Sequence, residues 1–389
     1  MKKYSIFCYL LTAIFYIVQV SVLGYTVYFL AENGYTAAQI SILMGVFGIV
    51  AAITQPTLGY IADRNKNIDF KRILTWIGFA VIILFIALYS FYQRKIAIGL
   101  LFGTIYLSTN NMSPFINASC FYYTDRGYNV DYGIARGCGS FSFAVVSYIL
   151  GNIMHKYGAR LVAVNGVVAS ILLFVVIMIM PRLKDDSLVI KKETHIKGSN
   201  TASSNIIMKY PSFFLMVLAV IFAMCFQNSD CGYMINIIEE LGGDSSHLGL
   251  ANAIAAMVEI PIMFLISKML KKIHVKKMIL IACAFYILRA FVFHIESMTA
   301  IYVAQVLQMF TFAILIPSSV YLSDDMMQEE DKNKGQTFIG MVITTGLILG
   351  TFAGGQLISI GGTDLLEIGC IVIASISCIF AILGNIVKN

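Results

Sequence analysis

Twelve apolar stretches, separated by short polar breaks, constrain this chain more than any other feature of its sequence. They lie, to within several residues, at 4–31, 37–61, 72–92, 96–123, 134–154, 161–180, 211–238, 248–267, 278–295, 299–323, 336–358 and 365–387. Each has about the 20 residues that an α-helix needs to cross a bilayer. Backbone polar groups in hydrocarbon must find partners within their own segment, so each stretch is expected to be helical. The sequence therefore predicts an all-α membrane protein with 12 transmembrane helices.

The composition agrees with this fold class. Of the 389 residues, 59% are hydrophobic and 12% are charged, which is about half the charged fraction of a soluble domain. Twelve spans use about 240 residues and leave no room for a large soluble domain. The net charge of +6 comes from Lys and Arg in the breaks between apolar stretches, so we expect the lipid bilayer as a partner and no nucleic acid.

The positive charges predict how the chain is oriented. With the N-terminus in the cytoplasm, only four of the 27 Lys and Arg residues fall in outside loops, and two lie inside apolar stretches. The four are Arg94, Lys95, Lys156 and Arg160, and the two are Arg136 and Arg289. Because cytoplasmic loops carry the excess of Lys and Arg, we expect a multi-pass protein of the cell (plasma) membrane with both termini in the cytoplasm.

A polar segment divides the spans into two groups of six. Residues 181–209 are rich in charged and small polar side chains, a composition typical of a linker. We therefore predict an N-terminal six-helix half at 1–180, a cytoplasmic linker at 181–209 and a C-terminal six-helix half at 210–389.

The break after the second span carries a recognisable motif. Gly59, Asp63 and Arg64 have the spacing G-x-x-x-D-R, and Arg72 closes the loop. This resembles the G-x-x-x-D-[RK] signature of the major facilitator superfamily, although the Gly expected between its basic groups is missing. The resemblance implies a cytoplasmic gating motif, in which a small residue allows close helix approach and the carboxylate pairs with a helix end or a basic group.

Further segments resemble the branch of that superfamily that contains lactose permease and other oligosaccharide:proton symporters. They are Gln55–Arg64 around the motif, Tyr132–Ser140 on the fifth span, Glu259–Phe264 on the eighth and Arg289 on the ninth. The resemblance implies the major facilitator fold of two six-helix halves. It also implies alternating access to a solute site near the bilayer midplane, between the halves.

Four ionisable residues sit well inside spans: Arg136, Asp230, Glu259 and Arg289. A charged side chain costs about 2.5–3.5 kcal/mol at the centre of an inserted helix. Such residues usually face a hydrated cavity or one another and mark a functional site. Structural salt bridges within single helices are the alternative reading.

The resemblance assigns the solute site. Arg136 matches the arginine that binds sugar hydroxyls in lactose permease, Asn117 replaces that permease's fourth-span carboxylate, and Phe143 replaces the tryptophan on which the sugar stacks. Polar side chains on other spans complete the predicted substrate site: Asn111, Gln19, Asp230 and Gln308. Interhelical hydrogen bonding without a ligand explains Asn111 and Gln308 equally well.

Proton coupling needs a buried carboxyl group that gains and loses a proton as its surroundings change. Glu259 is the predicted coupling residue, with Arg289 on the next span as its modulator. Where lactose permease has tenth-span His and Glu residues, this chain has Gln308 and Thr311. Asp230 is therefore expected to share the coupling role, with capping of a broken seventh helix as the alternative.

The sequence offers no catalytic, metal or cofactor motif. The eight cysteines form no C-x-x-C pair, and the five histidines are scattered at 155, 195, 247, 274 and 294. No nucleotide-binding glycine pattern follows a strand. We therefore expect no enzyme activity, no cofactor and no metal, and reduced cysteines. Gly346, Gly350 and Gly354 repeat every four residues, which predicts close helix packing.

These inferences predict a secondary active transporter that moves a small polar, sugar-like solute by proton symport and works as a monomer. Three alternatives remain open. A nucleoside:proton symporter fits the fourth-span Asn117, because that related group also has an Asn there. A multidrug efflux antiporter fits the many Phe, Tyr and Met residues. A channel or a membrane sensor would use the intramembrane charges without coupled gating.

Overall fold

The computed structural model describes residues 2–64, 70–92, 94–124, 126–181, 209–270 and 272–387, and this part of the chain contains helices and no strand. The first group is α1 (Lys2–Gln19), the π-helix η1 (Val20–Gly24), α2 (Thr26–Glu32), α3 (Ala37–Arg64), α4 (Phe70–Ser90), α5 (Lys95–Thr124), α6 (Tyr132–Tyr157) and α7 (Leu161–Met178). The second group is α9 (Pro211–Glu240), α10 (Ser245–Leu270), α11 (Val275–Phe293), α12 (Met298–Val306), the 3-10 helix η2 (Leu307–Met309), α13 (Phe312–Met326) and α14 (Glu329–Ile386).

The helices account for all twelve predicted spans. Nine helical segments of the described chain are long and apolar enough to cross a membrane. One of them, Phe338–Ile386, is two spans, because α14 leaves the helical conformation at Gly361 and at Gly362, whose φ is +70°. The long helices α5 and α11 supply the other two spans. The prediction of an all-α, twelve-span membrane protein is confirmed.

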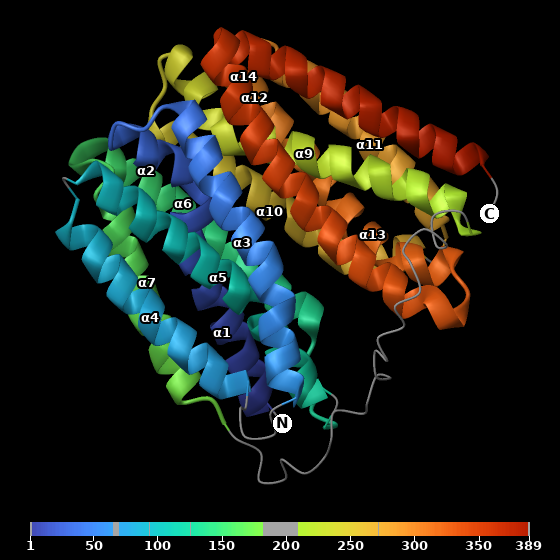
Figure 1. Ribbon diagram of the computed structural model, residues 1–389, viewed down its shortest axis with the longest axis horizontal. Coiled ribbons are helices and arrows are strands. Elements are labelled where there is room, and N and C mark those ends of the chain that lie inside the picture. The colour runs from blue at the N-terminus through green and yellow to red at the C-terminus, as the bar shows by residue number, and fades with distance from the viewer. Residues whose placement is uncertain are drawn as a thin grey trace.

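The spans are arranged as two six-helix halves (Figure 1). Helices α1 to α7 form one half, and helices α9 to α14 form the other. The exact boundaries at residues 180 and 210 stay a prediction, because residues 182–208 lie outside the described part. We call the end of the bundle that carries Pro181 and Lys209 the linker end, and the opposite end, which carries His155, the His155 end.

Two spans are interrupted inside the membrane, which hydropathy alone does not reveal. The first span passes from α1 into the π-helix η1 and then through Tyr25, whose φ and ψ are −132° and 18°, before α2 begins. The tenth span breaks between α12 and α13, where Gln308 lies in η2 and Thr311 has φ −102° and ψ −95°. Broken helices of this kind are found near substrate and ion sites in transporters, because they free polar groups at mid-depth.

The halves contact each other closely at the His155 end, where α6 crosses α10. A Cβ built on Gly151 would lie 2.5 Å from the backbone oxygen of Ser245 and 2.9 Å from the Cα of Gly249. Hydrogen bonds reinforce the crossing, from Ser245 Oγ to the Gly151 oxygen at 3.1 Å and from Asn252 Nδ2 to the Gly24 oxygen at 3.1 Å. A larger residue at Gly151 or Gly249 would collide with the facing helix, so these glycines allow the halves to approach each other closely here.

The predicted glycine stripe of the eleventh span does pack closely. Gly346 and Gly350 face the backbone oxygens of Ile221 and Cys225 on α9, and Gly354 faces the ring of Tyr233. Each would place a Cβ within 3 Å of these atoms. The stripe is therefore a packing surface within the second half, as the sequence predicts. The eight cysteines are free in this structure.

Candidate functional site

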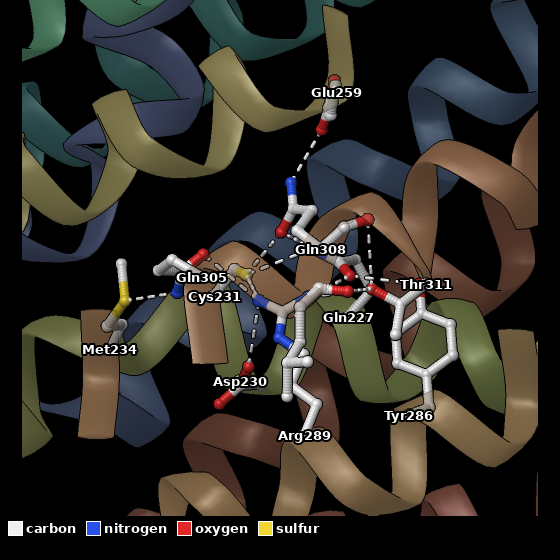
Figure 2. Close-up of polar contacts among 11 residues, drawn as sticks. Gln227, Asp230, Cys231, Met234, Glu259, Tyr286, Arg289, Gln305, Gln308 and Thr311 are labelled. Atoms are coloured by element: carbon white, nitrogen blue, oxygen red, sulfur yellow. Dashed lines mark hydrogen bonds and ion pairs between the residues drawn. The ribbon is translucent and has the colours of Figure 1, made fainter. Parts of the chain in front are cut away.

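A buried polar cluster lies in the second half, centred on Arg289 of α11 (Figure 2). The Arg289 side chain is fully buried. Its Nη2 lies 3.5 Å from Asp230 Oδ2 on α9, and it also contacts Cys231 Sγ at 3.1 Å and Gln305 Oε1 at 3.3 Å. In the described part of the chain, Asp230 Oδ2 accepts no hydrogen bond and Arg289 Nε donates none. The ion pair is therefore incompletely satisfied.

A chain of hydrogen bonds leads from this cluster to Glu259 on α10 (Figure 2). Arg289 Nη1 donates to Gln227 Oε1 at 3.0 Å, Gln227 Nε2 donates to Gln308 Oε1 at 3.2 Å, and Gln308 Nε2 donates to Glu259 Oε1 at 2.7 Å. Tyr286 also donates to Gln227 Oε1, at 3.1 Å. Glu259 is 6% exposed. Four helices, α9, α10, α11 and the broken tenth span, thus contribute to one connected network.

Arg136 faces this network from the first half. Its guanidinium lies 4.5 Å from the ring centre of Tyr16 on α1, and Nη1 donates to Ser140 Oγ at 3.1 Å. The charges of Arg136 and Glu259 act on each other across the boundary between the halves. A half-buried arginine stacked on an aromatic ring keeps its remaining donors free for a further partner.

The other predicted solute-site residues of the first half lie in different surroundings. Asn111 donates from Nδ2 to Thr54 Oγ1 at 2.9 Å, so its amide pairs α5 with α3. Gln19 is buried, and its Oε1 has no hydrogen-bond partner among the described residues. Asn117 is half-buried on α5. Phe143 lies next to the inter-half contact, since its ring is 3.4 Å from a Cβ built on Gly24.

Two alternative readings of the sequence are wrong. Asp230 does not cap a broken seventh helix, because α9 runs without interruption from Pro211 to Glu240. The Arg289 ion pair is not intrahelical, because its partner Asp230 is on another helix. The direct charged partner of Arg289 is Asp230, and its link to Glu259 runs through two glutamines.

Sequence reasoning missed three members of the cluster: Gln227, Cys231 and Tyr286. Gln227 was detectable, because it lies three residues before Asp230 and so shares its helix face, and Cys231 lies four residues after Gln227 on the face that these two share. Tyr286 lies three residues before Arg289 and follows the same rule. The spacing was present, but no rule from a single sequence says which face of a span turns inward.

The predicted gating motif is only partly described. Gly59 lies on α3, and no atom of the described residues lies within 4 Å of a Cβ built on it. Arg72 is exposed on α4. The side chains of Asp63 and Arg64 lie outside the described residues, so the role of this motif stays a prediction. Among the residues that the structure describes, no three His, Cys, Asp or Glu side chains are arranged to hold a metal ion.

Twelve spans in two six-helix halves, with buried charges at the centre, are the architecture of major facilitator transporters. The family model described as "MFS_1 like family" matches residues 7–366, and the chain belongs to this family. It is thus a multi-pass membrane transporter of the major facilitator type, as the sequence motifs indicate. No curated protein matches the sequence.

Solved structures share the whole fold at low sequence identity. The nucleoside transporter NupG is 14% identical, with a TM-score of 0.79 over 99% of this chain and 98% of that one. The POT family transporter PepTSo is 11% identical, with a TM-score of 0.73 over 99% and 97%. A bacterial homologue of the human lysosomal transporter Spinster, in an inward-facing and unoccupied conformation, is 14% identical, with a TM-score of 0.66 over 99% and 97%. These likenesses establish the fold.

Proposed function

We propose that the protein is a secondary active transporter that carries a small polar organic solute together with protons, by alternating access. The observation that carries the proposal is the buried hydrogen-bond chain from Glu259 to Arg289 in one half, which Arg136 faces from the other half. Opposite charges on facing halves of such a fold lie where a solute binds and where rocking of the halves exposes it to each side in turn.

The proposed orientation has both termini in the cytoplasm and the His155 end outside. The supporting argument is the excess of Lys and Arg in the segments at the linker end. With this orientation, the contacts of Gly151, Ser245 and Asn252 close the outer side. The arrangement described above is then one of the two end states of the transport cycle.

The proposed solute is sugar-like, with vicinal hydroxyl groups gripped by Arg136. The planar guanidinium can donate two parallel hydrogen bonds, and Tyr16 holds it in place by stacking. Asn117, Phe143 and Gln19 are the further proposed contacts in the first half, and Gln308 and Asp230 in the second. Asn111 supports the site indirectly, because its amide is engaged by Thr54.

Glu259 is the proposed coupling residue. It begins the hydrogen-bond chain to Arg289 and also lies within the electrostatic influence of Arg136. A proton taken up there from one side and released to the other links solute movement to the proton gradient. Asp230 shares this role, because it is the carboxyl group that pairs directly with Arg289.

A nucleoside is the second candidate for the solute. It is favoured by the match in fold to the nucleoside transporter NupG and by Asn117 on the fourth span. A ribose offers the same vicinal hydroxyls to Arg136 as a sugar does, and Tyr16 and Phe143 are rings on which a base can stack.

The test is transport by the purified protein in liposomes. Preloaded unlabelled solute should accelerate uptake of labelled solute, because counterflow requires a carrier that returns loaded. A panel of sugars, nucleosides and amphipathic cations identifies the solute class, with protein-free liposomes as the control. An inward proton gradient should then drive accumulation. Uptake without counterflow would indicate a channel and overturn the proposal.

A further inference from the structure

The two glutamines between Glu259 and Arg289 have a specific role beyond filling space. We propose that Gln308 and Gln227 are positioning residues that transmit the charge of Glu259 to Arg289, so that Glu259 and Asp230 compete for one arginine. This inference rests on the proposed role of Glu259 in proton coupling. It assigns the residues through which that role reaches the rest of the second half.

The relay has a fixed direction, which follows from chemistry. A guanidinium only donates hydrogen bonds, so Gln227 must present its oxygen to Arg289. Its nitrogen is then left for Gln308, which must accept with its oxygen and donate with its nitrogen. The distances of 3.0, 3.2 and 2.7 Å follow this order from Arg289 to Glu259. Every donor in the relay therefore points toward Glu259, the arrangement that stabilises a carboxylate there.

The far end of the relay is poised between two arrangements. Arg289 spreads its donors over Gln227, Cys231, Gln305 and Thr311, while its approach to Asp230 stops at 3.5 Å. Asp230 Oδ2 accepts no hydrogen bond among the described residues. A small movement of Arg289 away from Gln227 would complete the pair with Asp230. The strength of the hydrogen bond from Arg289 to Gln227 therefore controls how closely Arg289 approaches Asp230.

The position of Gln308 allows such a movement. It lies in η2, the three-residue 3-10 segment where the tenth span breaks between α12 and α13. Thr311, just beyond, lies well outside the helical region. A side chain on a broken turn can shift without displacing a whole helix, because the backbone there is not held by a continuous hydrogen-bond ladder.

The charged and titratable groups around the relay come from several helices. Glu259 faces Arg136 of α6, Tyr16 of α1 and, at longer range, Arg289 of α11. Asp230 faces Arg289 and, at longer range, Glu367 of α14. When Glu259 takes up a proton, Gln308 loses its anionic acceptor. The hydrogen bonds from Gln227 to Gln308 and from Arg289 to Gln227 then weaken. Arg289 then closes on Asp230.

The test compares three substitutions of similar shape, which shorten no helix and change no charge. Gln308→Met and Gln227→Met break the relay at successive links. Gln305→Met is the matched control, because Gln305 also accepts from Arg289, at 3.3 Å, but forms no hydrogen bond toward Glu259 in the described part of the chain. For each variant the pH profile of solute uptake and the rate of counterflow at one fixed pH are measured in liposomes.

We expect Gln308→Met to move the pH of half-maximal uptake by about one unit, to higher pH, since the carboxylate loses a charge-assisted hydrogen bond. Gln227→Met should move it in the same direction by less, and Gln305→Met should leave it unchanged. Counterflow should persist in Gln227→Met and in Gln305→Met. Gln308→Met also removes a proposed solute contact, so only the shift of its pH profile is compared with the other two. In a Glu259→Gln background, Gln308→Met should add no further change, because the charge that the relay senses is gone.

Several results would overturn the relay. A shift in Gln308→Met with none in Gln227→Met would make Gln308 a simple neighbour of Glu259. Equal behaviour of all three variants would make the glutamines general packing residues. If Gln308→Met is not recovered folded, Gln227→Met against Gln305→Met decides the question. Failure of the wild-type protein to show counterflow would instead refute the proposed function, so the two failures are distinguishable.

Discussion

His155 on α6 and Asp244, in the turn before α10, form an ion pair that joins the two halves, with Nδ1 2.6 Å from Oδ2. The same carboxylate contacts His247 Nδ1 at 3.0 Å and accepts a hydrogen bond from the Ser246 backbone nitrogen at 2.8 Å. Partial burial acts to raise the pKa of Asp244, but the hydrogen bonds from Ser246 and His247 outweigh it and hold that pKa well below its usual range. Asp244 therefore stays ionised at any physiological pH.

The contact depends on the ionised carboxylate of Asp244. Because the lowered pKa of Asp244 keeps this carboxylate ionised, its contribution to closure is lost only as the pH falls into strong acid. Tyr302 of α12 also senses the charge of Asp244.

The first prediction is that His155→Gln opens this end. An exposed ion pair contributes about 0.2–1 kcal/mol, which corresponds to a change of up to about fivefold in the equilibrium. Maleimide labelling of Asn252→Cys, which lies at the inter-half contact, measures the opening. We expect faster labelling in His155→Gln than in the protein that keeps His155. His294→Gln is the control, because His294 pairs with Glu367 inside the second half. Equal labelling with and without His155 would contradict a role of this ion pair in closure.

The second prediction concerns the crossing of α6 and α10. Gly151→Val places atoms where Ser245 and Gly249 already lie within 3 Å of a Cβ, so the His155 end cannot close and the cycle stops. We expect loss of counterflow with normal membrane insertion, and rapid labelling of Asn252→Cys. Gly45→Val on α3 is the matched control, since nothing lies within 4 Å of its Cβ position. Counterflow at the wild-type rate in Gly151→Val would show that closure of this crossing is unnecessary.

The outline of the fold could be predicted from the sequence because the bilayer imposes a length on every apolar stretch. The breaks at Val20–Gly24 and at Gln308 could not, since hydropathy is the same for a regular helix and an interrupted one. The residue types of the site were recognisable, because charged residues inside spans, here Arg136, Asp230, Glu259 and Arg289, are costly unless they serve a purpose. Their partners were not, because partners depend on the rotation of each helix about its axis. The bond of Asn111 to Thr54 illustrates this, since Asn111 was recognisable as a polar residue inside a span but the direction of its side chain was not.

The third prediction concerns solute recognition by Arg136. Arg136→Lys keeps the charge but loses both the planar pair of donors and the stacking on Tyr16. Loss of one charge-assisted hydrogen bond costs about 1.5–3 kcal/mol, so solute affinity should fall by about tenfold or more. Solute-induced thermal stabilisation of the purified protein measures the affinity. Arg160→Lys is the control, because Arg160 stacks on Tyr89 away from the site, with its guanidinium carbon 4.0 Å from the ring centre. Affinity within twofold of wild type would leave Arg136 as a structural counter-ion.

The last prediction separates coupling from transport itself. Glu259→Gln mimics the protonated side chain and can still accept from Gln308, whose Nε2 lies 2.7 Å from Glu259 Oε1. The loaded carrier should therefore still reorient, while the proton gradient no longer drives it. We expect counterflow to survive and uphill uptake under an imposed pH gradient to disappear. Glu239→Gln is the control, because Glu239 lies near the end of α9 and outside the hydrogen-bond chain. If Glu259→Gln still concentrates solute in response to the pH gradient, Glu259 is not the coupling residue. Asp230→Asn would then be the variant to test, because Asp230 is the remaining carboxylate within reach of Arg289 in the cluster.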